Sequence, residues 1–89
     1  MKRTTYNATT YVDDGSGRYV GSVDKYAHNS AKRAGEDFLR DYGDGPWEID
    51  PRASVRSGEY EAAQGYAFHV IEYTNPRGVR ARVRIEWEV

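Results

Sequence analysis

The chain of 89 residues contains no cysteine, and this absence removes several classes of site at once. Without thiols there is no disulfide framework, no iron–sulfur cluster, no thiolate zinc site and no cysteine nucleophile. No apolar run approaches the roughly 18 residues of a membrane-spanning helix, and residues 1–5 carry no apolar signal segment. We therefore expect a cytoplasmic protein that makes no contact with a membrane.

The sequence also lacks a strong charge of either sign. Thirteen Lys and Arg residues face fourteen Asp and Glu residues, which gives a net charge of −1 at pH 7. This balance provides no general attraction to nucleic acid or to an anionic membrane. A chain of this length builds one modest core, so we expect a single domain over 1–89 that is too small for a deep cofactor cleft.

Arginine and tyrosine are the residue types in excess, with ten arginines against three lysines and eight tyrosines. Both types are enriched at the energetic centres of protein–protein interfaces. Tyrosine is also a good strand residue, and this plainer explanation applies wherever the tyrosines fall in predicted strands.

The first third of the sequence predicts a β-hairpin, with strands over 4–12 and 18–26 and a turn at 13–17. The hydrophobic period then changes. Small and aromatic residues recur every three or four positions and predict a helix over 30–42. Asn29 or Ser30 can cap its start, Gly43 can end it, and Pro46 prevents it from resuming.

Residues 47–55 alternate as a strand does, but Pro51 interrupts them. Because proline cannot donate to a ladder, this strand is expected at an edge or bent. Residues 58–65 fit one helical turn or a loop. Two strands over 66–74 and 79–89 follow, separated by a turn at 75–78.

The predicted fold class is α+β, a single antiparallel sheet with one helix packed on one face. The element order is strand, strand, helix, strand, strand, strand. In the last strand Val83, Ile85 and Trp87 point to one face, and we expect them to pack against the helix. The helical residues expected opposite them are Ala34, Phe38 and Leu39.

Two pairings of the last hairpin are open. A type I turn followed by a bulge pairs Asn75 with Val79, sets Glu72 opposite Arg82 and places Tyr73 on the face of Val83. A tighter closure pairs Thr74 with Val79 and turns the whole preceding strand over. We favour the bulged turn, because its residues suit it and because it creates the Glu72–Arg82 pair.

No catalytic or metal-binding pattern is present. The two histidines, His28 and His69, have no partner at a catalytic or ligand-binding spacing, and no nucleophile motif occurs. The sequence therefore predicts no enzymatic activity, no cofactor and no metal. A histidine within a strand, such as His69, is most often a packed structural residue.

The best candidate site is a row of three arginines spaced by two along one strand. Their guanidinium groups project side by side at intervals of about 6.6–7 Å, which suits either carboxylates of a protein or phosphates of a nucleic acid. A solvated strand face is the alternative that assigns no function. The predicted partner-binding residues are Glu72, Tyr73, Arg77, Arg80, Arg82 and Arg84.

In its size, lack of cysteine and Tyr/Arg-rich plan of sheet and helix, the chain resembles small phage-encoded inhibitors of the anti-CRISPR type. This resemblance covers the general plan and no shared motif. It implies a non-catalytic protein-binding inhibitor that occludes a Cas protein or a CRISPR surveillance complex in the host cytoplasm. The alternative is a small nucleic-acid-binding module that uses an arginine and aromatic sheet face. A third interpretation is a homo-oligomer built through an edge strand.

Overall fold

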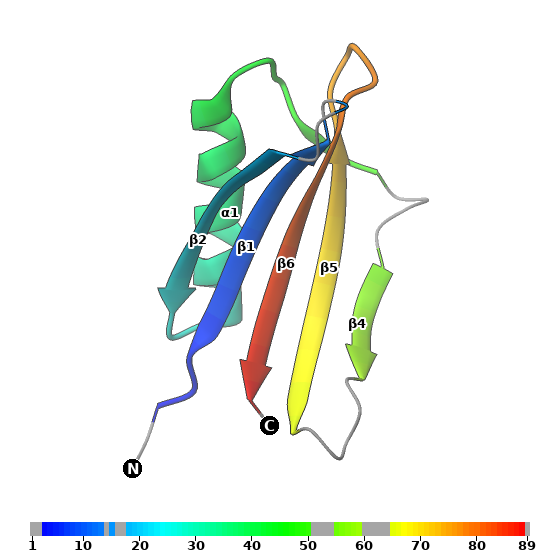
Figure 1. The fold of residues 1–89 in the computed structure, drawn as a ribbon. Coiled ribbons are helices and arrows are strands. Elements are labelled where there is room, and N and C mark those ends of the chain that lie inside the picture. Colours follow the sequence, from blue (N-terminus) through cyan, green and yellow to red (C-terminus); the bar gives the residue numbers. More distant parts are fainter. Residues whose placement is uncertain (1–2, 14, 16–17, 51–54, 60–64, 89) are drawn as a thin grey trace.

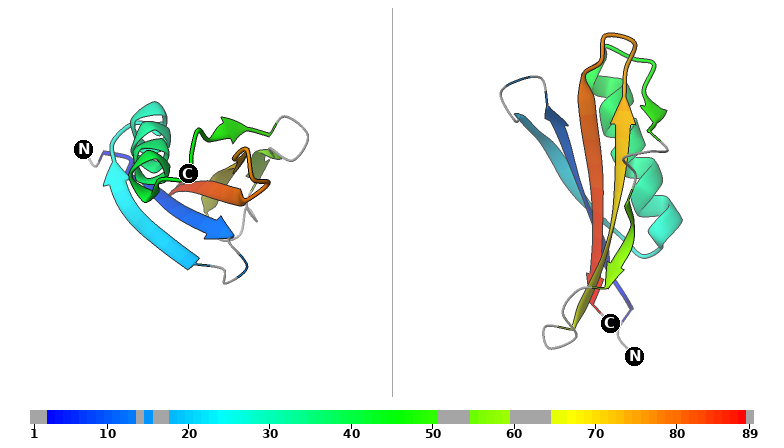
Figure 2. Two further views of the ribbon diagram at one scale, coloured as in Figure 1. Left: turned by 90° about the horizontal axis from the view of Figure 1, so that it is seen from above. Right: turned by 90° about the vertical axis from the view of Figure 1, so that its right-hand side faces the viewer.

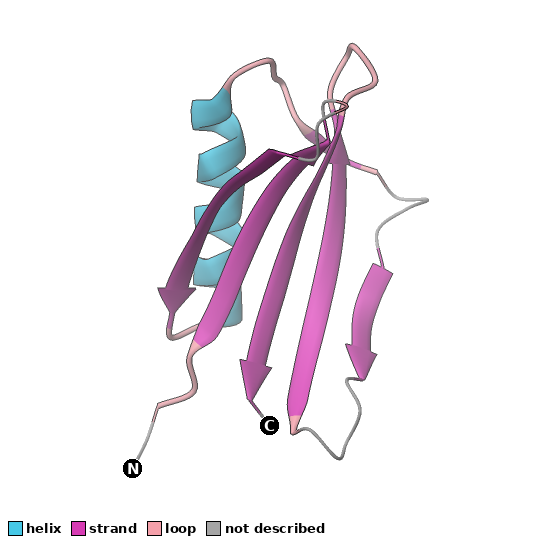
Figure 3. Cartoon of the chain, in the orientation of Figure 1, coloured by secondary structure: helices cyan, strands magenta, loops and turns pink. Residues whose placement is uncertain are grey.

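The computed structural model describes residues 3–13, 15, 18–50, 55–59 and 65–88. One antiparallel sheet carries one helix on one of its faces, so the predicted α+β fold and its element order are confirmed (Figures 1 and 3). The elements are β1 (Tyr6–Asp13), β2 (Arg18–Lys25), α1 (His28–Tyr42), β3 (Glu48–Ile49), β4 (Val55–Glu59), β5 (Tyr66–Thr74) and β6 (Arg80–Glu88).

The strands lie in the order β2, β1, β6, β5, and both β3 and β4 pair with the outer edge of β5. In place of the one interrupted strand predicted over 47–55, two short strands, β3 and β4, pair with the edge of β5. Strand β4 extends to Glu59, so Gly58 and Glu59 are strand residues where a helical turn or a loop was expected. Pro51 itself lies outside the described residues. The same is true of 14 and 16–17 in the predicted first turn and of 60–64 in the stretch that fitted a turn or a loop.

The last hairpin has the bulged pairing that we favoured. The Asn75 N–H donates to the Val79 carbonyl at 3.1 Å, and Glu72 stands opposite Arg82. Gly78 takes a φ of 80°, which glycine adopts without a Cβ penalty. Because a one-residue slip would exchange the two faces of β5, this turn decides which β5 side chains face the helix.

Helix α1 lies across β2, β1 and β6 and leaves the opposite face of the sheet open (Figure 2). It begins two residues before the predicted start, and the expected caps are wrong. Ala27 occupies the N-cap without a side-chain hydrogen bond, and its carbonyl accepts from the Ala31 N–H at 3.0 Å. Asn29 and Ser30 consequently lie within the first turn, beyond the capping position. The helix ends as predicted at Gly43, whose N–H donates to carbonyls of the last turn.

The core lies between α1 and the inner face of the sheet. The buried residues of α1 are Ala31, Gly35 and Leu39, a stripe of mostly small side chains that brings the helix close to the strands. The apolar residues buried in the core are Ala8, Val12, Ala31, Leu39, Ile71, Tyr73, Ala81, Val83 and Ile85.

The expected core is therefore correct for Val83, Ile85 and Leu39 and wrong for Ala34, Phe38 and Trp87, of which Ala34 is half-buried outside the core cluster. Phe38 is half-buried and lies over Gly21 of β2, where its ring fills the space of a missing side chain. Trp87 is also only half-buried, and its ring contacts other aromatic rings at the far end of the sheet. Both deviations follow from the position of α1, which is centred over β1 and β2 and reaches β6 only at its margin.

Candidate partner-binding face

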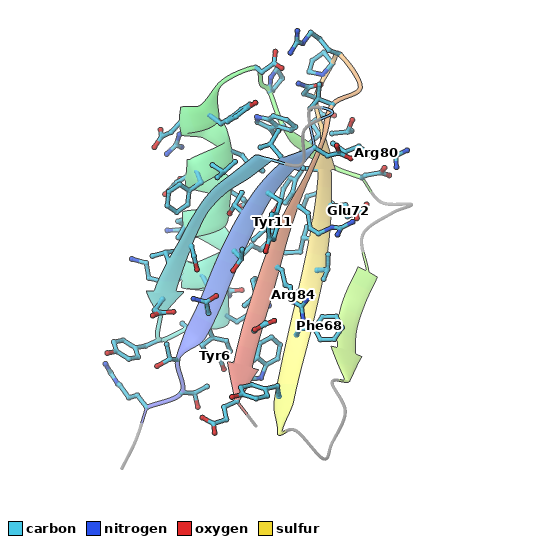
Figure 4. The ribbon with its side chains drawn as sticks, in the orientation of Figure 1. Tyr6, Tyr11, Phe68, Glu72, Arg80 and Arg84 are labelled. Atoms are coloured by element: carbon cyan, nitrogen blue, oxygen red, sulfur yellow. The ribbon has the colours of Figure 1, made fainter. Side chains whose placement is uncertain are left out.

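The sheet presents one face that no described element covers. Ala81, Val83 and Ile85 are buried beneath α1, so the residues alternating with them on β6 point the other way. Figure 4 looks onto this surface, which we call the open face. Its described side chains from β1, β5 and β6 include Asn7, Thr9, Tyr11, Phe68, Val70, Glu72, Arg80, Arg82, Arg84 and Glu86.

Arg82 is held in place by its neighbour across the β5–β6 ladder. Its Nε and Nη2 atoms donate to Oε1 of Glu72 at 3.1 and 2.8 Å. The Glu72 side chain is 17% exposed and that of Arg82 is 56% exposed. The carboxylate is therefore largely covered, while the guanidinium group keeps an exposed side for a further partner. The predicted pair of Glu72 and Arg82 is present.

Arg84 is fixed by two different neighbours. Its guanidinium carbon lies 4.8 Å from the centroid of the Phe68 ring, which is within the range of a cation–π contact. Its Nε atom also lies 2.8 Å from Oε1 of Glu86, two residues further along β6, an ion-pair contact that lacks the geometry of a hydrogen bond. The middle of the open face thus combines an aromatic ring, a cation and a carboxylate in one contact set.

Arg80 differs from the other two arginines of the row. It is exposed, and it forms no ion pair with any residue that the structure describes. With Tyr11, Glu72 and Arg82 it lines a hollow of about 290 Å³ at the Arg80 end of the open face. Tyr11 is 39% exposed, and Asp13, which also lines the hollow, stands opposite Arg80 in the β1–β6 ladder. This end therefore combines an aromatic ring, a cation and a carboxylate.

Two of the predicted site residues lie elsewhere. Tyr73 faces α1 and is 2% exposed, and its hydroxyl donates to Oε2 of Glu36 at 2.9 Å. Burial and the Glu36 carboxylate raise the pKa of Tyr73 above its usual range. Arg77 lies in the hairpin turn and pairs with the Asp44 carboxylate. Neither side chain shares the open face with the row, because β5 turns Tyr73 inward and the turn carries Arg77 toward the loop after α1.

A second hollow, of about 520 Å³, lies on the helix side of the sheet. Trp47, Tyr73 and Leu39 line it together with charged residues of α1, among them Arg33 and Arg40. Its aromatic groups already have partners: the Trp47 indole N–H donates to the Gly43 carbonyl at 3.0 Å, and Tyr73 bonds Glu36. Because this hollow lies on the opposite side of the sheet, a residue that lines it can serve as a control for variants of the open face.

Sequence reasoning missed one constellation, a contact between the two histidines. Nε2 of His28 lies 3.0 Å from Nδ1 of His69, although the residues are 41 positions apart. The Trp87 ring stands edge-on to His28, with the ring centroids 5.6 Å apart. Burial, followed by the charges of His28 and Lys32, lowers the pKa of His69. No spacing in the chain signals this pair, because only the path of α1 across the sheet creates it.

Comparison with models of known protein families, with curated proteins and with solved structures gave no match. In the part of the chain that the structure describes, no helix has both the length and the hydrophobicity needed to cross a membrane.

Proposed function

We propose that this chain is a non-catalytic protein-binding inhibitor whose open face docks onto a carboxylate-bearing surface of a larger protein. The observation that carries this proposal is the row of arginines, of which two contact neighbouring side chains and one, Arg80, is exposed and forms no ion pair with the described residues. Docking through this row covers the partner's surface and so blocks whatever that surface binds.

Fixing the arginines before binding favours affinity. A long side chain that is immobilised at an interface loses roughly 0.5–1.5 kcal/mol of rotamer freedom. Glu72 and Phe68 already restrain Arg82 and Arg84, so less of this cost remains at docking. Arginine and tyrosine are also among the residues enriched at the energetic centres of interfaces, and Arg80 and Tyr11 line the same hollow of the open face.

The charges of the open face favour a protein over a nucleic acid. Glu72 and Glu86 partly neutralise Arg82 and Arg84, whereas a phosphate backbone is bound through uncompensated cations. A protein surface instead offers single carboxylates at defined points, which a mixed face with one exposed cation fits better.

The resemblance to phage inhibitors of the anti-CRISPR type implies a Cas protein or a surveillance complex as the partner. That identity is the most specific form of the proposal. The general form requires only a protein partner with an acidic docking surface.

Affinity capture with matched baits tests the proposal. The baits are the wild-type chain, Arg80→Glu on the open face, and Arg33→Glu on α1, which makes the same charge change beside the second hollow. We expect one protein to be retained in stoichiometric amount by the wild type and by Arg33→Glu and to be lost with Arg80→Glu. Retention by Arg80→Glu together with loss by Arg33→Glu would move the site to the helix side and overturn the proposal.

Binding to random oligonucleotides distinguishes the nucleic-acid alternative. The proposal predicts no submicromolar binding at physiological salt. Submicromolar binding that falls with added salt, with a log–log slope of roughly −0.7 to −0.9 for each phosphate engaged, would support the alternative instead.

A further inference from the structure

The histidine pair joins the first turn of α1 to the middle of β5. These are the only two histidines in the chain, and both are half-buried. Their ring planes differ by 18°, and the ring centroids are 5.2 Å apart while the facing nitrogens are 3.0 Å apart. Because the nitrogens are so much closer than the centroids, the rings meet edge to edge. Each ring therefore directs a nitrogen at the other.

This arrangement is close to that of two imidazoles bound to one metal ion. With Zn–N bonds of about 2.0–2.1 Å in a tetrahedral site, two ligand nitrogens lie about 3.3–3.4 Å apart. The observed separation is a few tenths of an ångström shorter and is that of a hydrogen bond between the two rings, so the ion replaces this hydrogen bond as the rings turn toward it. Neutral imidazoles also need only a tautomer change, because each ring can carry its proton on the nitrogen that faces away.

The surroundings restrain the pair and place a positive charge beside it. Tyr6 and Trp87 stand edge-on to His28, with centroid distances of 6.2 and 5.6 Å. Lys32, one turn along α1 from His28, places a positive charge near His69, and its Nζ atom lies 3.5 Å from Oε2 of Glu36. The aromatic rings limit the ways in which His28 can turn, while the lysine opposes a cation.

We propose that His28 and His69 form a two-imidazole site for a divalent transition-metal ion such as Zn²⁺, which clamps the start of α1 to β5. Imidazole is a preferred ligand of Zn²⁺, Ni²⁺ and Cu²⁺ and a poor ligand of Mg²⁺. Among the residues described here, no cluster of three or more His, Asp or Glu could hold an ion, so water completes the coordination. The site is therefore weaker than a structural zinc site with four protein ligands.

This inference revises the expectation of no metal, which rested on spacing along the chain. It does not depend on the proposed function, because the pair lies on the helix-facing side of the sheet. Metal binding stabilises the folded chain alone, since the unfolded chain does not hold two imidazoles 41 positions apart at one point. The clamp links α1 to β5, in addition to the packing of α1 on β2, β1 and β6.

Titration of the wild-type chain with ZnCl₂, followed by imidazole NMR, tests the site directly because only two ring systems contribute signals. We expect both rings to shift together and to saturate at one Zn²⁺ per chain, with no response to MgCl₂. Binding should weaken as the pH falls from 7 to 5, because protons compete with the ion for the imidazole nitrogens. A response from one ring alone, or from neither ring at 1 mM ZnCl₂, would overturn the proposal.

Variants supply an independent measurement through thermal unfolding. At about 100 times the dissociation constant, Zn²⁺ should raise the midpoint of the wild type by roughly 10–20 °C. His28→Gln and His69→Gln should each abolish this rise, and Lys32→Gln should lower the dissociation constant because it removes the opposing charge. An equal rise in both histidine variants would place the ion elsewhere and contradict the assignment.

Discussion

Val83 occupies the space that a side chain on Gly35 would need. A Cβ atom built on Gly35 would lie 2.6 Å from Cγ1 of Val83 and 3.2 Å from the Thr10 hydroxyl. Valine cannot move aside easily, because its branched side chain has one strongly preferred rotamer. The helix lies this close to β6 only because position 35 has no side chain.

We therefore expect Gly35→Ala to destabilise the fold by about 1–3 kcal/mol, the usual cost of overpacking a core. Helix propensity alone predicts the reverse, a gain of about 1 kcal/mol. Urea unfolding distinguishes the two, and the double variant G35A/V83A should recover part of the loss because it removes the obstructing methyl groups. A higher urea midpoint for Gly35→Ala would show that the contact is not tight.

Tyr73 makes the stability of the fold sensitive to alkaline pH. Because burial and Glu36 raise the pKa of Tyr73 above the 10.0 of a free tyrosine, its hydroxyl stays protonated in the folded chain when it ionises in the unfolded chain. The stability that it contributes is complete below pH 10 and is lost as the pH rises above 10. We expect the urea midpoint to fall from pH 8 to pH 11 by more in the wild type than in Tyr73→Phe. Equal losses in both proteins would contradict the buried Tyr73–Glu36 bond.

Asn75 connects the last hairpin to the loop after α1. It is 6% exposed, its Oδ1 accepts from the N–H groups of Arg77 and Val79, and its Nδ2 donates to the carbonyl and the carboxylate of Asp44. Asn75→Asp keeps the acceptor, loses both donors and sets two carboxylates side by side. We expect a loss of about 1–3 kcal/mol in urea unfolding. The double variant N75D/D44N should regain much of the lost stability. An Asn75→Asp variant as stable as the wild type would show that the hydrogen bonds between Asn75 and Asp44 contribute nothing.

The histidine pair makes the stability of the fold sensitive to acid as well. Burial, with the charges of His28 and Lys32, lowers the pKa of His69 below 6.5, so the unfolded chain takes up a proton before the folded chain does. This contribution to stability is complete above pH 6.5 and is lost as the pH falls below it. In metal-free buffer the midpoint of thermal unfolding should drop from pH 7 to pH 5 by more in the wild type than in His69→Gln. The same drop in both would assign the acid sensitivity to other groups.

The sequence was sufficient to predict what depends on local patterns. The turn chemistry of Asn75 and Gly78, together with the Glu72–Arg82 pair, led to the correct register of the last hairpin, and alternation identified Val83 and Ile85 as core residues. These features depend on residues that are near neighbours in the chain or directly opposite in one hairpin.

Features that depend on where α1 crosses the sheet could not be predicted in the same way. A helical stripe does not specify which strands it covers, so the contact of Phe38 with Gly21, the rings around Trp87 and the His28–His69 pair emerge only from the assembled fold. The arginine row was recognised as a candidate site, but the structure gives its three members different roles. Arg82 and Arg84 are restrained by neighbours, and Arg80 forms no ion pair with the rest of the described chain.

The central claim is that the open face, through Arg80, binds a protein, and calorimetric titration of the captured partner tests it most directly. The measurement compares Arg80→Ala with Arg33→Ala, two truncations of exposed arginines on opposite sides of the molecule. Truncating a desolvated arginine that meets a carboxylate costs about 2–5 kcal/mol of binding free energy. Arg80→Ala should therefore raise the dissociation constant by at least about thirtyfold. Arg33→Ala should change it by less than about twofold, as expected of a residue outside the interface. An unchanged dissociation constant for Arg80→Ala would contradict the account.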